Sequence, residues 1–222
     1  PVAWKERAVQ GGSWYVSIPF VGPANFMKFE HWWHYARGWL FHFFGQDNRA
    51  FENYRAAFCV NPRNVQSARH LAAIAAERQQ FDVAEKWFEA ALALTPEDGA
   101  SWFNLGYVRE RADRPVEAIK AFSEAVRLTP GQDRAWYGMG LAHARLGQHA
   151  EAATAFEKSV ALQPMNGESY YQLGMAYHHA NCPDDVARIV IRLVEFEPKR
   201  AKKLAHDAAR PDLLRFVPEL PF

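Results

Sequence analysis

The 222-residue chain is almost neutral, with 26 Lys and Arg against 25 Asp and Glu, and 49% of its residues are hydrophobic. This composition excludes an intrinsically disordered chain, and a formal charge of +1 provides no general attraction to nucleic acid or to anionic membranes. The most apolar stretch, Trp32 to Phe44, is interrupted by His34, Arg37 and His42 and is too short for a transmembrane helix. We therefore expect a folded protein that neither spans a membrane nor binds nucleic acid.

The two cysteines, Cys59 and Cys182, form no CxxC pair and no metal-ligand spacing. Two cysteines in a chain of this length do not make a disulfide framework, so a reducing compartment, most simply the cytoplasm, is expected. The sequence opens at Pro1 rather than at Met, which leaves a removed upstream segment as the alternative.

Residues 1–30 precede every repeated feature of the chain. They contain an aromatic, β-type run from Trp14 to Phe20 in which Pro19 disfavours a central strand. We expect an extended N-terminal arm. Because clustered aromatic side chains are unfavourable in water, the arm either covers the first repeat or enters a partner's surface.

Prolines at a constant interval divide the rest of the chain. Proline lacks an amide hydrogen and crowds the preceding turn, so recurring prolines mark boundaries between helices. The interval is 34 residues (96−62, 130−96, 164−130, 198−164) for Pro62, Pro96, Pro130, Pro164 and Pro198. This frame predicts five units, at residues 31–64, 65–98, 99–132, 133–166 and 167–200.

The third and fourth units share a pattern of aromatic, small and apolar residues. The third has Trp102, Leu105, Gly106, Ala118, Phe122 and Pro130, the fourth has Trp136, Met139, Gly140, Ala152, Phe156 and Pro164, and the fifth opens with Tyr170, Leu173, Gly174 and Tyr177. This pattern resembles the signature of the tetratricopeptide repeat (TPR) family, W-x2-L-G-x2-Y, then A-x3-F, then P. The outer units depart from it, with Ala72 in place of the glycine in the second, and Val186 and Val190 in place of Ala and Phe in the fifth.

The resemblance implies an all-α protein, a right-handed α-solenoid of about five 34-residue helix-turn-helix units over residues 31–200. A glycine inside a helix costs roughly 1 kcal/mol against alanine, so its recurrence indicates that close helix packing offsets this loss. We interpret the signature residues as structural, with Trp102, Phe122, Trp136 and Phe156 in the core and Gly106, Gly140 and Gly174 at positions of close approach.

Residues 201–222 are expected to close the C-terminal end of the solenoid. Residues 199–209 are rich in Lys, Arg and Ala, a composition typical of the polar capping helix that an open solenoid end needs. The tail after Pro211 carries Leu213, Leu214, Phe216, Val217 and Leu220. We expect this apolar tail to dock on the last helices, with contact to a partner as the alternative.

No catalytic constellation is evident among the nine histidines and the other reactive side chains. His31 and His34 lie about one helical turn apart and could chelate a metal together, but no third ligand is evident. HExxH, GxSxG and glycine-rich phosphate loops are all missing from the sequence. The sequence therefore predicts no catalytic residue, no metal site and no cofactor.

The resemblance also implies a binding surface, because the first helix of each TPR unit lines the concave side of the solenoid. Only Asn104 fits the residue types with which family members clamp a C-terminal carboxylate, so the groove favours a partner with apolar or aromatic anchors. We expect the aromatic groove residues to have no packing role. The residues predicted in the groove are Tyr35, Trp39, Arg69, Phe103, Asn104, Tyr107, Arg134, Tyr137, Leu141, Tyr171, Met175 and His178, with Arg69 and Arg134 as isolated charges.

Two functions remain open at this point. The first is a non-enzymatic adaptor that holds a peptide, helix or protein in the aromatic groove. The alternative is a permanent structural or assembly subunit of a larger complex, docked through the N-terminal arm and the first repeat. An enzyme is the least expected class, and the residues determine neither the partner nor the oligomeric state.

Overall fold

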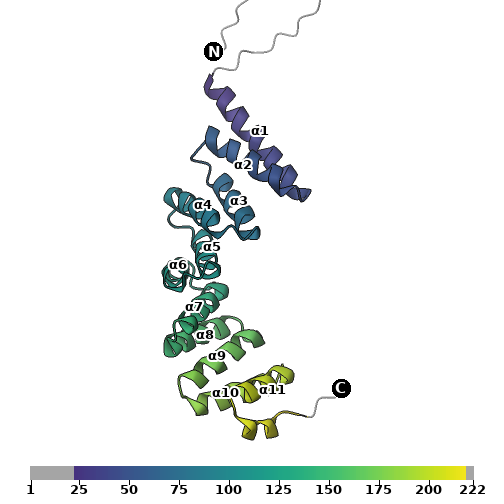
Figure 1. The fold of residues 1–222 in the computed structure, drawn as a ribbon, viewed down its shortest axis with the longest axis vertical. Helices are drawn as coiled ribbons and strands as arrows, with labels where there is room; N and C mark the ends of the chain where they lie inside the picture. Colours follow the sequence, from purple (N-terminus) through teal and green to yellow (C-terminus); the bar gives the residue numbers. More distant parts are fainter. Residues whose placement is uncertain (1–22, 219–222) are drawn as a thin grey trace, which may run out of the picture.

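The computed structural model describes residues 23–218, with side chains from Phe29 onward, and residues 1–22 and 219–222 lie outside the described part. Residues 23–218 form α-helices and one short 3-10 helix, η1 (Pro211–Phe216), with no strand among them. The expected all-α solenoid is confirmed (Figure 1). The helices are α1 (Pro23–Phe43), α2 (Asp47–Val60), α3 (Val65–Glu77), α4 (Phe81–Leu94), α5 (Gly99–Arg111), α6 (Pro115–Leu128), α7 (Asp133–Arg145), α8 (His149–Leu162), α9 (Gly167–His179), α10 (Pro183–Val194) and α11 (Pro198–Asp207).

Each helix contacts the next one in the chain, and the helices follow one another along an elongated, curved stack (Figure 1). Two consecutive helices make one repeat, so that α1 and α2 form the first and α9 and α10 the fifth. In addition, α5 contacts α7, α7 contacts α9, and α9 contacts α11. Since only elements on the inner side of a curved stack come close enough to skip a neighbour, these odd-numbered helices line the inner side.

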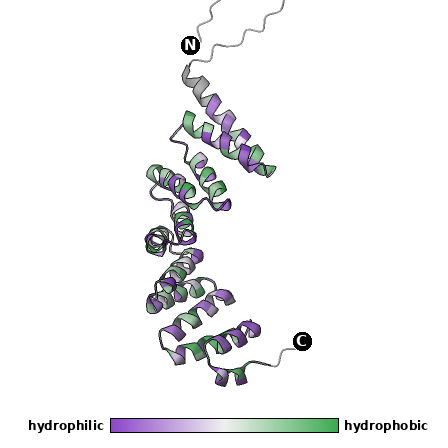
Figure 2. Cartoon of the chain, in the orientation of Figure 1, coloured by the Kyte–Doolittle hydropathy of each residue, from purple (hydrophilic) through white to green (hydrophobic). Residues whose placement is uncertain are grey.

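Apolar and polar residues are interspersed along the helices, so the core is distributed along the stack rather than gathered at one centre (Figure 2). Local signals set several helix boundaries. The side chains of Asn64 and Asn166 accept hydrogen bonds from the backbone N–H groups of Ser67 (2.8 Å) and Ser169 (3.2 Å), which caps α3 and α9. Helices α6, α10 and α11 begin with proline, which is tolerated there because the first N–H groups of a helix have no intrahelical partner.

The turn inside each repeat contains one residue in the left-handed region of φ. Successive members are 34 residues apart (79−45, 113−79, 147−113, 181−147). Glycine adopts this conformation freely and Asn and Asp tolerate it, but a glutamine there shows that tertiary context imposes it. The residues are Gly45, Gln79, Asp113, Gly147 and Asn181, with φ of 67°, 60°, 61°, 72° and 58°.

Phe122 shows how adjacent repeats pack. Its side chain is 2% exposed and lies against Gly106 of its own repeat and Gly138 of the next. A Cβ added at Gly106 would lie 2.7 Å from the ring, and one at Gly138 would lie 2.6 Å from it. Phe156 sits on Gly140 in the same way, with 2.6 Å between the ring and an added Cβ. Both glycines of the fourth-repeat helix α7 therefore allow a phenylalanine ring to approach the backbone.

Trp102 and Trp136 have a second role besides packing on the core. Each is half-buried, and its indole N–H donates a hydrogen bond to the backbone carbonyl six residues earlier: Pro96 at 2.8 Å and Pro130 at 3.0 Å. We expected plain core residues. The indole N–H needs an acceptor, and the loop carbonyl supplies it, so each tryptophan ties the first helix of its repeat to the preceding loop.

The C-terminal end is closed by α11 and η1. A Cβ added at Gly174 would lie 2.4 Å from Leu204 of α11, which is fully buried. Leu204 thus occupies the place on the repeat glycine that phenylalanine takes in the third and fourth repeats, since the fifth has the smaller Val190. Leu213 of η1 is 3% exposed in the same apolar cluster. The outer side of α11 carries Lys202 and Lys203 in solvent.

The N-terminal end differs from the expected boundary. Helix α1 begins at Pro23, so the expectation of an extended arm is wrong for residues 23–30. Proline at the first helical position is favourable, and no further proline or glycine follows until Gly38, which explains the early start. The rest of the expected arm, residues 1–22, lies outside the described residues.

Candidate functional site

The predicted groove residues all lie on odd-numbered helices, but only some of them are accessible. Tyr107 on α5 is 45% exposed and Trp39 on α1 is 53% exposed. Asn104 and Arg134 are also exposed. The others are half-buried, namely Tyr35, Arg69, Phe103, Tyr137, Leu141, Tyr171, Met175 and His178.

Two of the aromatic groove residues pack on the core. The ring centroid of Phe103 lies 6.0 Å from that of Phe122, and the centroid of Tyr137 lies 5.6 Å from that of Phe156. Burial, together with the Glu168 carboxylate, raises the pKa of Tyr137 to about 12. The expectation of no packing role is therefore wrong for Phe103 and Tyr137, because a side chain at this position lies over the seam between the two helices of its own repeat.

Arg69 is paired rather than isolated. Its guanidinium forms an ion pair with Asp98, and its Nε donates a hydrogen bond to Oγ of Ser101 at 3.1 Å. Asp98 is the residue immediately before α5, so Arg69 on α3 links the second repeat to the third. The prediction of an isolated groove charge is wrong for Arg69, since the ion pair depends on how one repeat sits on the next.

Tyr35 belongs to a contact among α1, α2 and α3. Its hydroxyl is 3.2 Å from Nε2 of His70, and its ring centroid lies 5.6 Å from that of Tyr54. Burial raises the pKa of Tyr35. Burial lowers the pKa of His70, and the nearby His42 lowers it further. Trp39 instead faces outward and stacks on Phe43 at 5.7 Å.

A cavity of about 430 Å³ lies between α7 and α9, on the inner side of the stack. Leu141, Tyr171 and Met175, all predicted as groove residues, form its apolar wall. The structure therefore brings together three predicted residues that come from two adjacent repeats. The remaining lining residues were missed by the sequence analysis, and they are Ala144, Arg145, His149, Gln172, Ala176 and His179.

Three of the missed residues carried a usable signal. Ala144 and Arg145 lie three and four residues after Leu141, and His179 lies four residues after Met175, so helical spacing places them beside predicted groove residues. His149 comes from the start of α8, after the left-handed turn at Gly147, and Gln172 comes from a neighbouring face of α9. Helical spacing on the first helix of a repeat predicts neither of these.

The charged groups at the cavity edge have partners within the protein. Arg145 pairs with Glu110 at 2.9 Å and with Asp113. The hydroxyl of Tyr171 donates to a carboxylate oxygen of Asp207 at 2.7 Å, and burial followed by this hydrogen bond raises the pKa of Tyr171 to about 12. The His149 and His179 rings stack at 4.8 Å. The cavity thus combines an apolar wall with a polar rim.

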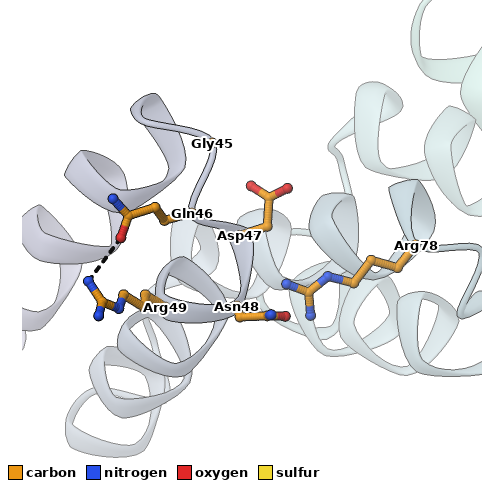
Figure 3. A pocket seen from close by; sticks show the side chains of 6 residues that line it. All are labelled: Gly45, Gln46, Asp47, Asn48, Arg49 and Arg78. Carbon is orange, nitrogen blue, oxygen red and sulfur yellow. Dashed lines mark hydrogen bonds between the residues drawn. The ribbon is translucent and has the colours of Figure 1, made fainter.

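A second cavity, also of about 430 Å³, lies at the turn between α1 and α2 and is lined by polar side chains (Figure 3). Nη1 of Arg49 donates to Oε1 of Gln46 at 3.0 Å. Arg78 reaches in from the end of α3, with its Cζ 5.5 Å from the centre of the Phe51 ring. None of the predicted groove residues lines this cavity, which separates it from the groove.

Across residues 23–218, no group of three or more His, Cys, Asp or Glu side chains could hold a metal ion. None of the helices that the structure describes is both long and apolar enough to cross a membrane. Both cysteines, Cys59 and Cys182, are free thiols.

The sequence matches the tetratricopeptide repeat family over residues 48–98 and 75–133, and again over residues 133–166. Together these matches span residues 48–166, more than half of the 222-residue chain. The chain belongs to the tetratricopeptide repeat family. The resemblance seen in the sequence is thereby confirmed, and no curated protein matches the sequence.

Solved structures resemble this TPR chain along most of its length. The crystal structure of MamA protein is 20% identical with a TM-score of 0.71, covering 87% of this chain and 97% of that one. YrrB, described as a TPR protein with an unusual peptide-binding site, is 20% identical with a TM-score of 0.70, covering 80% and 90%. MamA 41-end from Desulfovibrio magneticus RS-1 is 18% identical with a TM-score of 0.71, covering 77% and 96%. At these identities the likeness shows the fold alone.

The TPR matches leave both ends of the described stack outside. Helix α1 precedes residue 48, and the fifth repeat follows residue 166. In the first repeat, Tyr54 takes the place of phenylalanine, with its ring 2.8 Å from a Cβ added at Gly38. The cavity between α7 and α9 therefore lies where the last matched TPR unit meets the divergent fifth one.

Proposed function

We propose that this TPR protein is a non-enzymatic interaction module that holds a peptide, helix or protein segment on its inner side. One observation carries the proposal: Leu141, Tyr171 and Met175 form the apolar wall of the cavity between α7 and α9. A cavity of about 430 Å³ has room for a bulky apolar side chain. Apolar and aromatic anchors in such pockets carry most of the binding energy at protein interfaces.

The accessible residues on α5 extend this surface. A segment anchored in the cavity runs along α7 toward α5, where Tyr107 is 45% exposed beside Asn104. The guanidinium of Arg111 lies 6.0 Å from the Tyr107 ring. The segment therefore needs one bulky apolar anchor for the cavity and a second apolar or aromatic contact for Tyr107. The description of YrrB as a TPR protein with a peptide-binding site supports the same class of ligand.

The test fills the cavity without disturbing the core. Ala144 is half-buried on the cavity wall, and Ala144→Arg places a long side chain into that space while its charged end reaches solvent. Ala161→Arg is the matched control, since Ala161 is exposed near the end of α8 and does not line the cavity. Peptides selected by phage display on the native protein provide the probe, and fluorescence anisotropy measures their affinity.

We expect Ala144→Arg to weaken peptide binding by about 30-fold, the equivalent of a hot-spot loss of about 2 kcal/mol, whereas Ala161→Arg binds as the native protein does. Thermal unfolding checks that both variants stay folded. Equal peptide affinity for the two variants contradicts the assignment of this cavity, and a selection that enriches no peptide contradicts the module itself.

The alternative, a permanent subunit of a larger complex, is favoured by the outer side of α1. Trp32 and Phe43 on this helix are 59% and 70% exposed, which is unusual for a helix at the end of a stack. Purification from the native source distinguishes the two functions. A partner that stays bound in constant stoichiometry on dilution favours the permanent subunit, and a partner that dissociates favours the module.

A further inference from the structure

Helix α1 is apolar on the side that faces away from the rest of the protein. Its inner side carries polar groups: Nδ1 of His31 is 3.0 Å from the carbonyl oxygen of Ala57, and His42 lies 3.2 Å from the Asp47 carboxylate. Its outer side carries residues three and four positions apart that are between 46% and 70% exposed. These outer residues are Phe29, Trp32, Trp33, Trp39, Leu40 and Phe43.

The exposed apolar area of this outer face is large for a protein surface in contact with water. A Phe or Trp side chain buries about 150–250 Å² when it is enclosed, so five of them at these exposures leave roughly 600 Å² of apolar surface in solvent. That is the upper end of the roughly 300–600 Å² seen for the largest apolar patch on a monomer. The terminal unit of a solenoid is expected to have a polar outer face, and α1 has the reverse.

The C-terminal end shows how this chain covers a terminal repeat. There the segment that follows the fifth repeat turns back on it, with Leu204, Leu213 and Leu214 packed in one cluster. At the N-terminal end the equivalent segment is residues 1–22, which enter α1 at Pro23, at one end of the exposed face. The same topology is therefore available at both ends.

The segment before Pro23 has the length and the pattern for this role. An extended chain advances about 3.3 Å per residue and a helix about 1.5 Å per residue, so roughly ten extended residues span the length of α1. Residues 13–22 supply that number. Within them Trp14, Val16, Ile18 and Phe20 alternate with other residues and fall on one side of an extended chain.

We propose that residues 14–20 fold back as an extended segment over the outer face of α1, with Trp14, Val16, Ile18 and Phe20 against the helix. The alternate positions, Tyr15, Ser17 and Pro19, then face solvent. A short tether gives the segment an effective concentration of about millimolar, which favours it over a second copy of the chain. The proposal is independent of the groove, because the cavity between α7 and α9 belongs to the other half of the stack.

Paramagnetic broadening in NMR spectra of the full-length chain tests the proposal. A spin label is attached to Ser17→Cys in a Cys59→Ser, Cys182→Ser background, since Ser17 is placed on the solvent side. We expect the label to remove the indole N–H signals of Trp32, Trp33 and Trp39 and to leave that of Trp136 intact. Val16→Ser with Ile18→Ser should restore the three signals, while the matched variant Tyr15→Ser should leave the broadening in place.

A mixed sample separates the occupants of the face. Isotope-labelled chains without a spin label are combined with spin-labelled chains at natural isotope abundance. We expect no broadening in this mixture. Broadening of the α1 tryptophans in the mixture as well as in the first sample identifies a second copy as the occupant and overturns the proposal. Absence of broadening in both samples also overturns it and leaves the face to another partner.

Discussion

At the C-terminal end of the solenoid, Leu204 of α11 is fully buried on Gly174, whereas at the N-terminal end the outer side of α1 leaves Trp32 and Phe43 59% and 70% exposed. At both ends the terminal repeat has no neighbouring repeat to bury its outer face, so each end needs another cover. The C-terminal end is covered by α11 and η1, whose Leu204 and Leu213 are buried, while Lys202 and Lys203 of α11 face solvent. The N-terminal end needs a cover from residues outside the described part or from another molecule.

The inner packing of the two end repeats is alike. Gly38 receives the ring of Tyr54 and Gly174 receives the side chain of Leu204, and in both cases an added Cβ would lie less than 3 Å away. The two ends therefore differ on their outer faces and not in their internal packing. A repeat can therefore be well packed inside and still leave its outer face uncovered when it stands at the end of the stack.

The largest expected effect is at the C-terminal cap. Leu204→Ala removes a fully buried side chain, and we expect it to lower the free energy of unfolding by about 2–5 kcal/mol. Lys202→Ala, on the exposed side of the same helix, should change it by no more than about 0.5 kcal/mol. Urea denaturation followed by circular dichroism measures both. Similar values for the two variants would show that α11 does not close this end.

The next effect tests whether the end repeats are equally well packed inside. Gly38→Ala and Gly174→Ala each force a contact below 3 Å, with an overpacking cost of about 1–3 kcal/mol that a helix-propensity gain of about 1 kcal/mol partly offsets. We expect both variants to be destabilised to a similar extent. Gly131→Ala is the control, because a Cβ there meets open space. A destabilised Gly174 variant beside an unchanged Gly38 variant would show that the two end repeats are not equally well packed.

A smaller effect depends on pH and is confined to the N-terminal end. His70 stacks on Tyr54 at 4.5 Å, with Tyr35 and His42 beside it, and burial lowers its pKa below the ordinary 6.5. As the pH falls from about 7.5 to about 5.5, the unfolded chain binds a proton that the folded chain resists, so the folded state loses stability. Protection factors from amide hydrogen exchange, which correct for the slower intrinsic exchange at low pH, should therefore fall in α1 to α3 more than in α9 to α11.

Two variants check the origin of this pH effect. His70→Phe keeps an aromatic ring against Tyr54 and removes the titrating group. We therefore expect the loss of protection in α1 to α3 between about pH 7.5 and about pH 5.5 to disappear. His206→Gln replaces a histidine whose side chain is 85% exposed, and it should leave this loss of protection as it is. Retention of the effect in His70→Phe assigns it to another group.

The smallest expected effect concerns the two thiols. Cys59 in the first repeat is exposed and Cys182 before α10 is half-buried in the C-terminal cluster. Ellman's reagent should therefore modify Cys59 first, and Cys59→Ser should change the free energy of unfolding by no more than about 0.5 kcal/mol. Faster modification of Cys182 would show that the C-terminal end opens more readily than the N-terminal end.

The sequence by itself determined the repeat and the close contacts inside each unit. Prolines 34 residues apart mark the boundaries, and the signature glycines Gly106 and Gly140 meet Phe122 and Phe156 of the following helix. These features are local, because both partners lie within one period and each residue type is dictated by a short-range steric need. The family assignment rests on the same short-range pattern.

Tertiary structure alone decided how one repeat sits on the next. It paired Arg69 with Asp98 and joined Leu141 to Met175 across the cavity between α7 and α9. It also left the apolar face of α1 exposed to solvent. The pattern of aromatic residues along that helix does not tell whether this face is buried or exposed. Helical periodicity tells which residues share a face, but the curvature of the stack and the presence of a neighbour decide whether that face is covered.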